Sequence, residues 1–139
     1  MYNFIKENRF KVLVIPLFIY WIILFIGTTM PSPQYVDVFE ISDKIKHFTA
    51  YFILSFLLGM NLYFQEKWKA LSKYFLSYTF IICVTYGLLD EIHQIFVPNR
   101  TCEFYDWLAD LSGSLLAVLL LRFTVKILLK SKNINETIK

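Results

Sequence analysis

Three stretches of this chain carry no charged residue and are almost wholly apolar: 12–30, 48–64 and 74–89. They are 19, 17 and 16 residues long, close to the roughly 20 residues that cross the hydrocarbon of a bilayer as a helix. Basic side chains at their ends can extend to the headgroups, so each run is long enough to span. The composition agrees, because a chain of 139 residues that is 57% hydrophobic and 19% aromatic does not resemble a small soluble domain.

A fourth apolar run, 107–129, is interrupted by Asp110, Arg122 and Lys126, but its middle, LSGSLLAVLLL, is as apolar as the others. We therefore predict an all-α polytopic membrane protein, a bundle of four transmembrane helices at about 10–30, 43–65, 71–96 and 105–130, in a single domain over 1–139. The first run follows basic residues as a signal peptide would, but no small-x-small cleavage site follows it, so we expect it to remain as a helix.

The basic residues predict the orientation, since lysine and arginine are enriched in short cytoplasmic loops. Ten of the fourteen fall on one side of the predicted bundle: Lys6, Arg9, Lys11, Lys67, Lys69, Lys73, Lys126, Lys130, Lys132 and Lys139. Only Lys44, Lys46 and Arg100 fall on the other side. We expect both termini on the cytoplasmic side of the membrane.

Most acids belong to the opposite, outer half, together with both histidines: Asp37, Glu40, Asp43, Asp90, Glu91, Glu103, Asp106 and Asp110. Helical spacing gathers many of them into stripes, one on each of three helices. These stripes hold Asp43, Lys44, His47 and Tyr51; Gly87, Asp90, Glu91 and Gln94; and Asp106, Asp110, Gly113 and Ala117. Since carboxylates do not face lipid without a large cost, we expect the stripes to converge into one outer cluster.

We expect Lys46 to point elsewhere into solvent. We expect Lys44 and Arg100 to pair with five acids of this cluster: Asp43, Asp90, Glu91, Asp106 and Asp110. Five carboxylates around two cations cannot all ionise unless a pKa is raised or a further cation is present. Three interpretations stay open: a structural network of helix ends, with Asp43 following Ser42 as a cap; a metal site; and an anion site for a phosphate or carboxylate.

A metal site would gather His47, His93, Glu91 and Asp90. His93 and Glu91 lie two residues apart on a helix and cannot form an HExxH-type pair. Asp90 and His93 with His47 are geometrically possible ligands, but their spacing does not support them, so a metal site is the least favoured of the three and we assign no metal and no cofactor. Glycine-rich phosphate loops, GxSxG elbows and cysteine–histidine pairs do not occur in the sequence, and Cys83 and Cys102 form no framework.

The polar motifs resemble one family of bacterial membrane proteins, the VanZ-like family. DKIKHFTAYFILS is similar to its DKxxHFxxYxxL element, and DEIHQIFVPNRTCEFYDWLADLSGSLLA to its later DExxQxFxPxR segment; the match is strongest over 42–117. The positions that correspond are Asp43, Lys44, His47, Tyr51, Asp90, Glu91, Gln94, Pro98, Arg100, Asp106 and Gly113. Two residues depart from the family, since Asp110 stands where it commonly has asparagine and Asn99 where it commonly has glycine.

The resemblance implies a cell-envelope role in the cytoplasmic membrane of a bacterium, associated with low-level resistance to teicoplanin-type glycopeptides. We expect an outward-facing site that binds an anionic lipid or wall component, formed by Asp43, Lys44, His47, Tyr51, Asp90, Glu91, Gln94, Arg100, Asp106 and Asp110. The partners would be membrane lipids such as polyprenyl phosphates or a lipid-linked wall precursor, and no nucleic acid. The alternative is an integral membrane enzyme acting on such a lipid, with Glu91, His47 or Asp90 in catalysis; a transporter is less favoured because no span is broken at the midplane.

Overall fold

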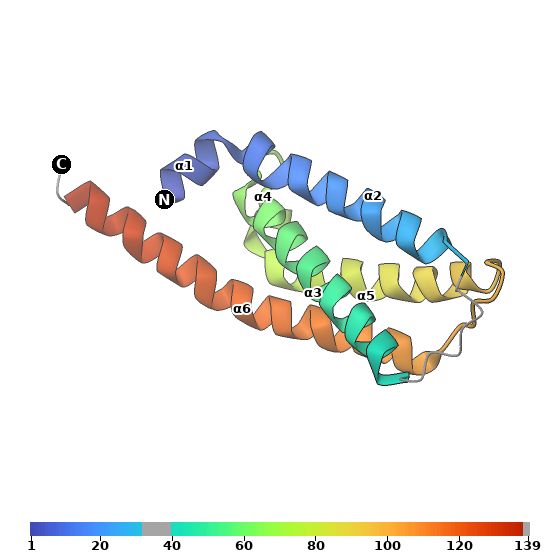
Figure 1. The fold of residues 1–139 in the computed structure, drawn as a ribbon. Coiled ribbons are helices and arrows are strands. Elements are labelled where there is room, and N and C mark those ends of the chain that lie inside the picture. The colour runs from blue at the N-terminus through green and yellow to red at the C-terminus, as the bar shows by residue number, and fades with distance from the viewer. Residues whose placement is uncertain (32–39, 138–139) are drawn as a thin grey trace.

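The computed structural model describes residues 1–31 and 40–137, and these form a bundle of four long helices (Figure 1). Each is long and apolar enough to cross a membrane, over Phe10–Thr29, Asp43–Phe64, Phe75–Gln94 and Phe104–Asn133. The described residues contain no β-strand. The predicted all-α, four-helix membrane fold is therefore confirmed.

The helices begin and end close to where the apolar runs do, with some differences in detail. In chain order they are α1 (Tyr2–Glu7), the π-helical η1 (Phe10–Val14), α2 (Ile15–Thr29), α3 (Glu40–Phe64), α4 (Lys69–Lys73), α5 (Phe75–Gln94) and α6 (Phe104–Thr137). The irregular turn η1 precedes Pro16, which lacks the N–H that a regular helix would use there. The third long helix starts at Phe75 rather than near 71, because the short helix α4 occupies the connection.

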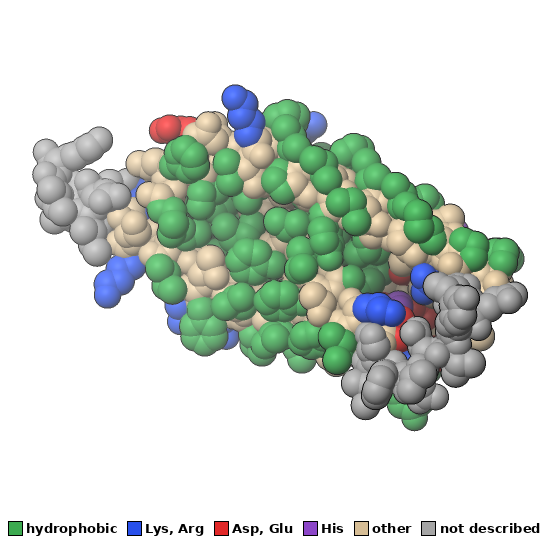
Figure 2. All heavy atoms as spheres, in the orientation of Figure 1, with side chains coloured by type: hydrophobic (Ala, Val, Ile, Leu, Met, Phe, Trp, Pro, Cys, Tyr) green, Lys and Arg blue, Asp and Glu red, His purple; other side chains and the backbone are tan. Residues whose placement is uncertain are grey.

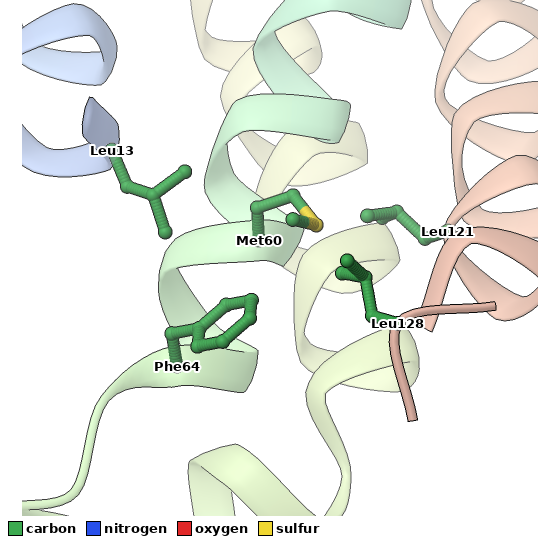
Figure 3. Close-up of a cluster of buried hydrophobic side chains, with 5 residues drawn as sticks. All are labelled: Leu13, Met60, Phe64, Leu121 and Leu128. Atoms are coloured by element: carbon green, nitrogen blue, oxygen red, sulfur yellow. The ribbon is translucent and has the colours of Figure 1, made fainter. Parts of the chain in front are cut away.

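Helix α3 lies at the centre of the bundle and packs closely along α6. A Cβ added to Gly113 would stand 2.2 Å from the backbone oxygen of Phe48, so this approach requires glycine. Further along, a buried apolar cluster joins η1, α3 and α6, and Figure 3 shows its five side chains pointing toward one another: Leu13, Met60, Phe64, Leu121 and Leu128.

The two ends of the bundle differ in their charges, while apolar side chains cover the middle (Figure 2). The polar end is the end at which α3 begins, α5 ends and α6 begins; the basic end holds α1, α4 and the last turns of α6. At the basic end most of the described charged side chains are exposed, as in the ion pair of Lys6 Nζ with Glu66 Oε1 at 2.7 Å. Asp37 and Lys139 lie outside the described residues, as do the side chains of Glu40 and Ser42, so the predicted cap at Ser42 is not described.

Candidate functional site

The three polar stripes converge at the polar end. Helix α3 contributes the first stripe, the last turns of α5 the second and the first turns of α6 the third. Six polar side chains of these stripes are at most 7% exposed: His47, Asp90, Glu91, Gln94, Asp106 and Asp110. Buried polar groups need hydrogen-bond or ion-pair partners, and most of these six side chains have one.

His47 forms the centre of the buried group. Its Nδ1 lies 3.0 Å from Asp110 Oδ1 and 3.7 Å from Glu91 Oε1, so one histidine on α3 faces a carboxylate from α6 and another from α5. Glu91 is held in place from its other side, because its Oε2 accepts the backbone N–H of Glu103 at 2.9 Å. Gln94 Nε2 donates to Glu91 Oε1 at 3.4 Å.

Lys44 ties α3 to the start of α6. Its Nζ lies 2.7 Å from Asp106 Oδ1 and 2.6 Å from Glu103 Oε2. The hydrogen bond from the Lys44 ammonium lowers the pKa of Glu103 below its usual value. Glu103 belongs to the outer acids of the sequence, but the sequence did not indicate that it shares a cation with Asp106.

The predicted ion pairs of Arg100 are not found among the described residues, although Arg100 does lie at the predicted site. Its Nε donates to the carbonyl of Met30 at 3.3 Å and its Nη2 to that of Gly27 at 3.1 Å. The described ion pairs contain none between Arg100 and the five acids assigned to it, and Lys44 reaches only one of them, Asp106. The guanidinium instead holds the end of α2, whose last carbonyls have no partner further along that helix.

A cavity of about 360 Å³ lies beside His47, between α2, α3 and α5. Its lining combines charged, hydroxyl and apolar groups: Leu24, Gly27, Thr28, Asp43, Lys46, His47, Ala50, Tyr51, Asp90 and Arg100. Asp90 Oδ2 and the Tyr51 hydroxyl are buried and have no hydrogen-bond partner among the described residues. The cavity therefore presents polar atoms that the described part of the protein leaves for something else to satisfy.

Lys46 was predicted to point elsewhere, yet it lines this cavity with its Nζ 3.7 Å from Asp43 Oδ1. Helical spacing indicates this position, because Lys46 lies three residues after Asp43 and four before Ala50, and residues at these intervals share one helix face. Its side chain is nonetheless 61% exposed, which agrees with the expected contact with solvent.

The residues able to hold a metal differ from the set considered from the sequence. His93 stacks on Phe25 of α2, with ring centroids 5.7 Å apart. The described groups whose ligand atoms lie within 4.8 Å of one another are His47 with Glu91 and Asp110, and Asp43 with His47 and Asp106.

Comparison with known families identifies the chain. A family model described as VanZ/LLP1 matches residues 5–128, which is most of its length. The chain belongs to the VanZ/LLP1 family. The resemblance seen in the polar motifs is thus confirmed, and the protein is VanZ-like, of a family linked to glycopeptide resistance. No curated relative and no solved structure matches it.

One departure from the family's pattern has a structural explanation. Asn99, where VanZ-like proteins commonly have glycine, adopts a φ of 59° in the connection between α5 and α6. This left-handed conformation favours glycine, and asparagine is among the few other residues that adopt it at modest cost. The turn that delivers Arg100 to α2 is therefore compatible with either residue.

Proposed function

We propose that this VanZ-like protein lowers susceptibility to teicoplanin-class glycopeptides by binding an anionic lipid or a lipid-linked wall component. The observation that carries the proposal is the cavity beside His47, because it combines cations with an apolar wall. Lys46 and Arg100 lie on its lining, and Leu24, Gly27 and Ala50 provide apolar surface. Phosphate groups are bound by such cations, and a lipid chain would remain in contact with the apolar side.

The distribution of basic residues supports a site on the outer side of a bacterial cytoplasmic membrane, with both termini in the cytoplasm. A wall precursor held at the outer leaflet would meet the drug there. Orientation is tested separately by placing a thiol at Lys69 of α4 in a cysteine-free background. Labelling of that thiol by an impermeant reagent in intact cells would contradict the proposed topology.

The function is tested by expressing the protein in a susceptible Gram-positive host and measuring tolerance to teicoplanin and vancomycin. We expect a larger gain for teicoplanin. Lys46→Gln removes a cavity cation that is largely exposed and should lower the gain at equal protein abundance. Lys130→Gln, at the exposed basic end, is the matched control and should keep it.

Ligand binding is measured on the purified protein with a polyprenyl phosphate in nanodiscs, against the corresponding uncharged polyprenol. The phosphate should bind more tightly than the alcohol, and Lys46→Gln should reduce the difference. Equal binding of both lipids, or tolerance unchanged by Lys46→Gln, would leave the charged cavity as part of a structural network.

Enzymatic action on such a lipid is the second candidate. It is favoured by one observation: His47 lines the cavity and lies within reach of the two carboxylates of Glu91 and Asp110, an arrangement suited to proton transfer. Asp90, on the same lining, is a further candidate base. Incubation of the wild type with a polyprenyl phosphate or diphosphate, followed by mass spectrometry of the lipid, would reveal turnover that His47→Gln should abolish.

A further inference from the structure

We infer that His47, Glu91 and Asp110 form a binding site for a divalent transition-metal ion, with Zn²⁺ as the best match. The inference does not rest on the lipid ligand proposed above. It starts from the positions of three ligand atoms contributed by three helices, one each from α3, α5 and α6.

The distances from His47 Nδ1 to the two carboxylates suit a single ion, and all three ligand atoms lie within 4.8 Å of one another. Nitrogen and oxygen ligands lie about 2.1 Å from Zn²⁺, so two atoms that share the ion are at most about 4.2 Å apart. His47 Nδ1 is 3.0 Å from Asp110 Oδ1 and 3.7 Å from Glu91 Oε1. An ion between these atoms replaces the proton that Nδ1 shares with Asp110, so binding releases a proton when that site is occupied.

The charges of the group suit a divalent ion. If His47 is an imidazolium, the group with Glu91 and Asp110 keeps one net negative charge, although Glu91 is 1% exposed and Asp110 is fully buried. A neutral imidazole, two carboxylates and one divalent cation carry no net charge. Uncompensated charge inside a protein is costly, and a divalent ion removes it while both carboxylates stay ionised.

Two buried carboxylate oxygens in or near this group are available to a cation. Asp90 is 4% exposed and lines the cavity beside His47, and its Oδ2 has no hydrogen-bond partner among the described residues. Asp110 Oδ2 is likewise buried without a described partner. Both oxygens remain available in or beside the group that would hold the ion.

The neighbouring residues favour this trio over the second set, Asp43 with His47 and Asp106. Asp106 already has the Lys44 ammonium 2.7 Å from its Oδ1, and Asp43 is about one-third exposed with Lys46 nearby. Glu91, by contrast, is oriented by the backbone N–H of Glu103 and by Gln94. Such outer hydrogen bonds are typical supports of metal ligands. Imidazole and carboxylate together match Zn²⁺ better than Mg²⁺, which prefers oxygen ligands alone.

The test uses the full chain purified without a histidine tag, stripped with a chelator and dialysed against Zn²⁺. We expect one Zn²⁺ per chain, a rise in melting temperature and release of a proton in weakly buffered solution. Asp110→Asn and His47→Gln should each weaken binding at least ~100-fold, since even outer-shell changes cost about 10- to 100-fold. His93→Gln is the matched control, because His93 stacks on Phe25 and should leave affinity unchanged.

Two outcomes would overturn the site. The wild type could bind no Zn²⁺ and gain no thermal stability from it, which would leave His47 as an imidazolium paired with two carboxylates. Alternatively, Asp110→Asn and His47→Gln could bind as tightly as the wild type, which would place the ion elsewhere. If neither variant folds, X-ray absorption of the wild-type Zn²⁺ complex decides, since the site requires one imidazole and oxygen ligands.

Discussion

Helices α3 and α2 both span the bundle, but they are held in very different ways. Half of the spanning window of α3 is buried inside the protein, against 11% of that of α2. Along the seam between α3 and α6, side chains bond directly across the interface, as in Ser55 with Ser114 and His47 with Asp110. The described side-chain hydrogen bonds between α2 and the rest run to backbone carbonyls, from Tyr20 to Ala50 and from Arg100 to Gly27, beside ring contacts such as that of Phe25 with His93.

The polar residues at the polar end are of two kinds, those in the α3–α6 seam and those that line the cavity toward α2. Lys44, His47 and Asp110 have partners within the seam, and His47 also reaches the edge of the cavity. Lys46 and Asp90 line the cavity toward α2, where the described residues leave space. A seam residue should therefore affect stability first, whereas a cavity residue should affect ligand binding first.

The largest effect is expected from His47→Leu. It leaves Glu91 and Asp110 buried with no cation in their group, and loss of one member of a buried charged pair typically costs about 3–5 kcal/mol. The free energy of unfolding in mixed detergent micelles measures this cost. Adding Asp110→Leu should recover part of it, because the second change removes one of the stranded charges.

The corresponding change on the cavity side is Asp90→Asn. This side chain already has an unpartnered oxygen, so the loss of unfolding free energy should be well below that of His47→Leu. Equal losses of unfolding free energy for His47→Leu and Asp90→Asn would contradict the proposed difference between residues of the α3–α6 seam and residues that line the cavity.

Two glycines sharpen the comparison by packing alone. Gly113→Ala places a Cβ 2.2 Å from the backbone oxygen of Phe48, which cannot move aside as a side chain can. We expect a loss of about 3 kcal/mol, the upper end of what overpacking costs. Gly27→Ala meets nothing within 4 Å and lies within α2, so it should be neutral or stabilise by up to about 1 kcal/mol. Thermal unfolding of both variants measures these effects. Similar melting temperatures would show that the seam at Gly113 is packed no more tightly than α2 at Gly27.

The sequence predicted the fold because membrane spans have a strong signal. Long uncharged runs identify helices, and stripes such as Asp106, Asp110 and Gly113 identify the faces that meet. It did not predict α4, since a five-residue helix in a basic connection has no apolar periodicity of its own. The contacts of α2 were equally hidden, because a helix that is apolar all round does not show which face is buried.

For the candidate site, the sequence predicted which residues gather but not how they pair. Helical spacing was enough to bring His47, Glu91 and Asp110 to one end. The partner of Arg100 could not be derived, because it depends on the path of the chain through Pro98 and Asn99 and on free carbonyls at the end of α2. Side-chain pattern carries no information about such backbone acceptors.

A smaller effect is expected in the middle of the seam. Ser55→Ala removes the donor to Ser114 Oγ at 3.0 Å and leaves that fully buried hydroxyl without this contact. Hydrogen bonds between membrane helices contribute about 0.6 kcal/mol on average, so the loss should be of that order. The double variant with Ser114→Ala should be no worse than the single one, because no hydroxyl is then left unpaired. A double variant that loses twice as much would indicate that each serine has a second, separate role.

The smallest effect concerns the exposed margin of the seam, where Lys44 meets Glu103. The Glu103 side chain is 46% exposed, so Glu103→Gln should cost about 0.5 kcal/mol or less at neutral pH. Because the Lys44 hydrogen bond lowers the pKa of Glu103 below its ordinary 4.5, the carboxylate contributes its stability above that value. The contribution disappears as the pH falls through the lowered pKa and Glu103 becomes protonated in the folded protein. The melting temperatures of wild type and Glu103→Gln should therefore differ slightly at pH 7 and converge in strong acid. A difference that stays constant between these conditions would mean that the glutamate acts by packing and not by its charge.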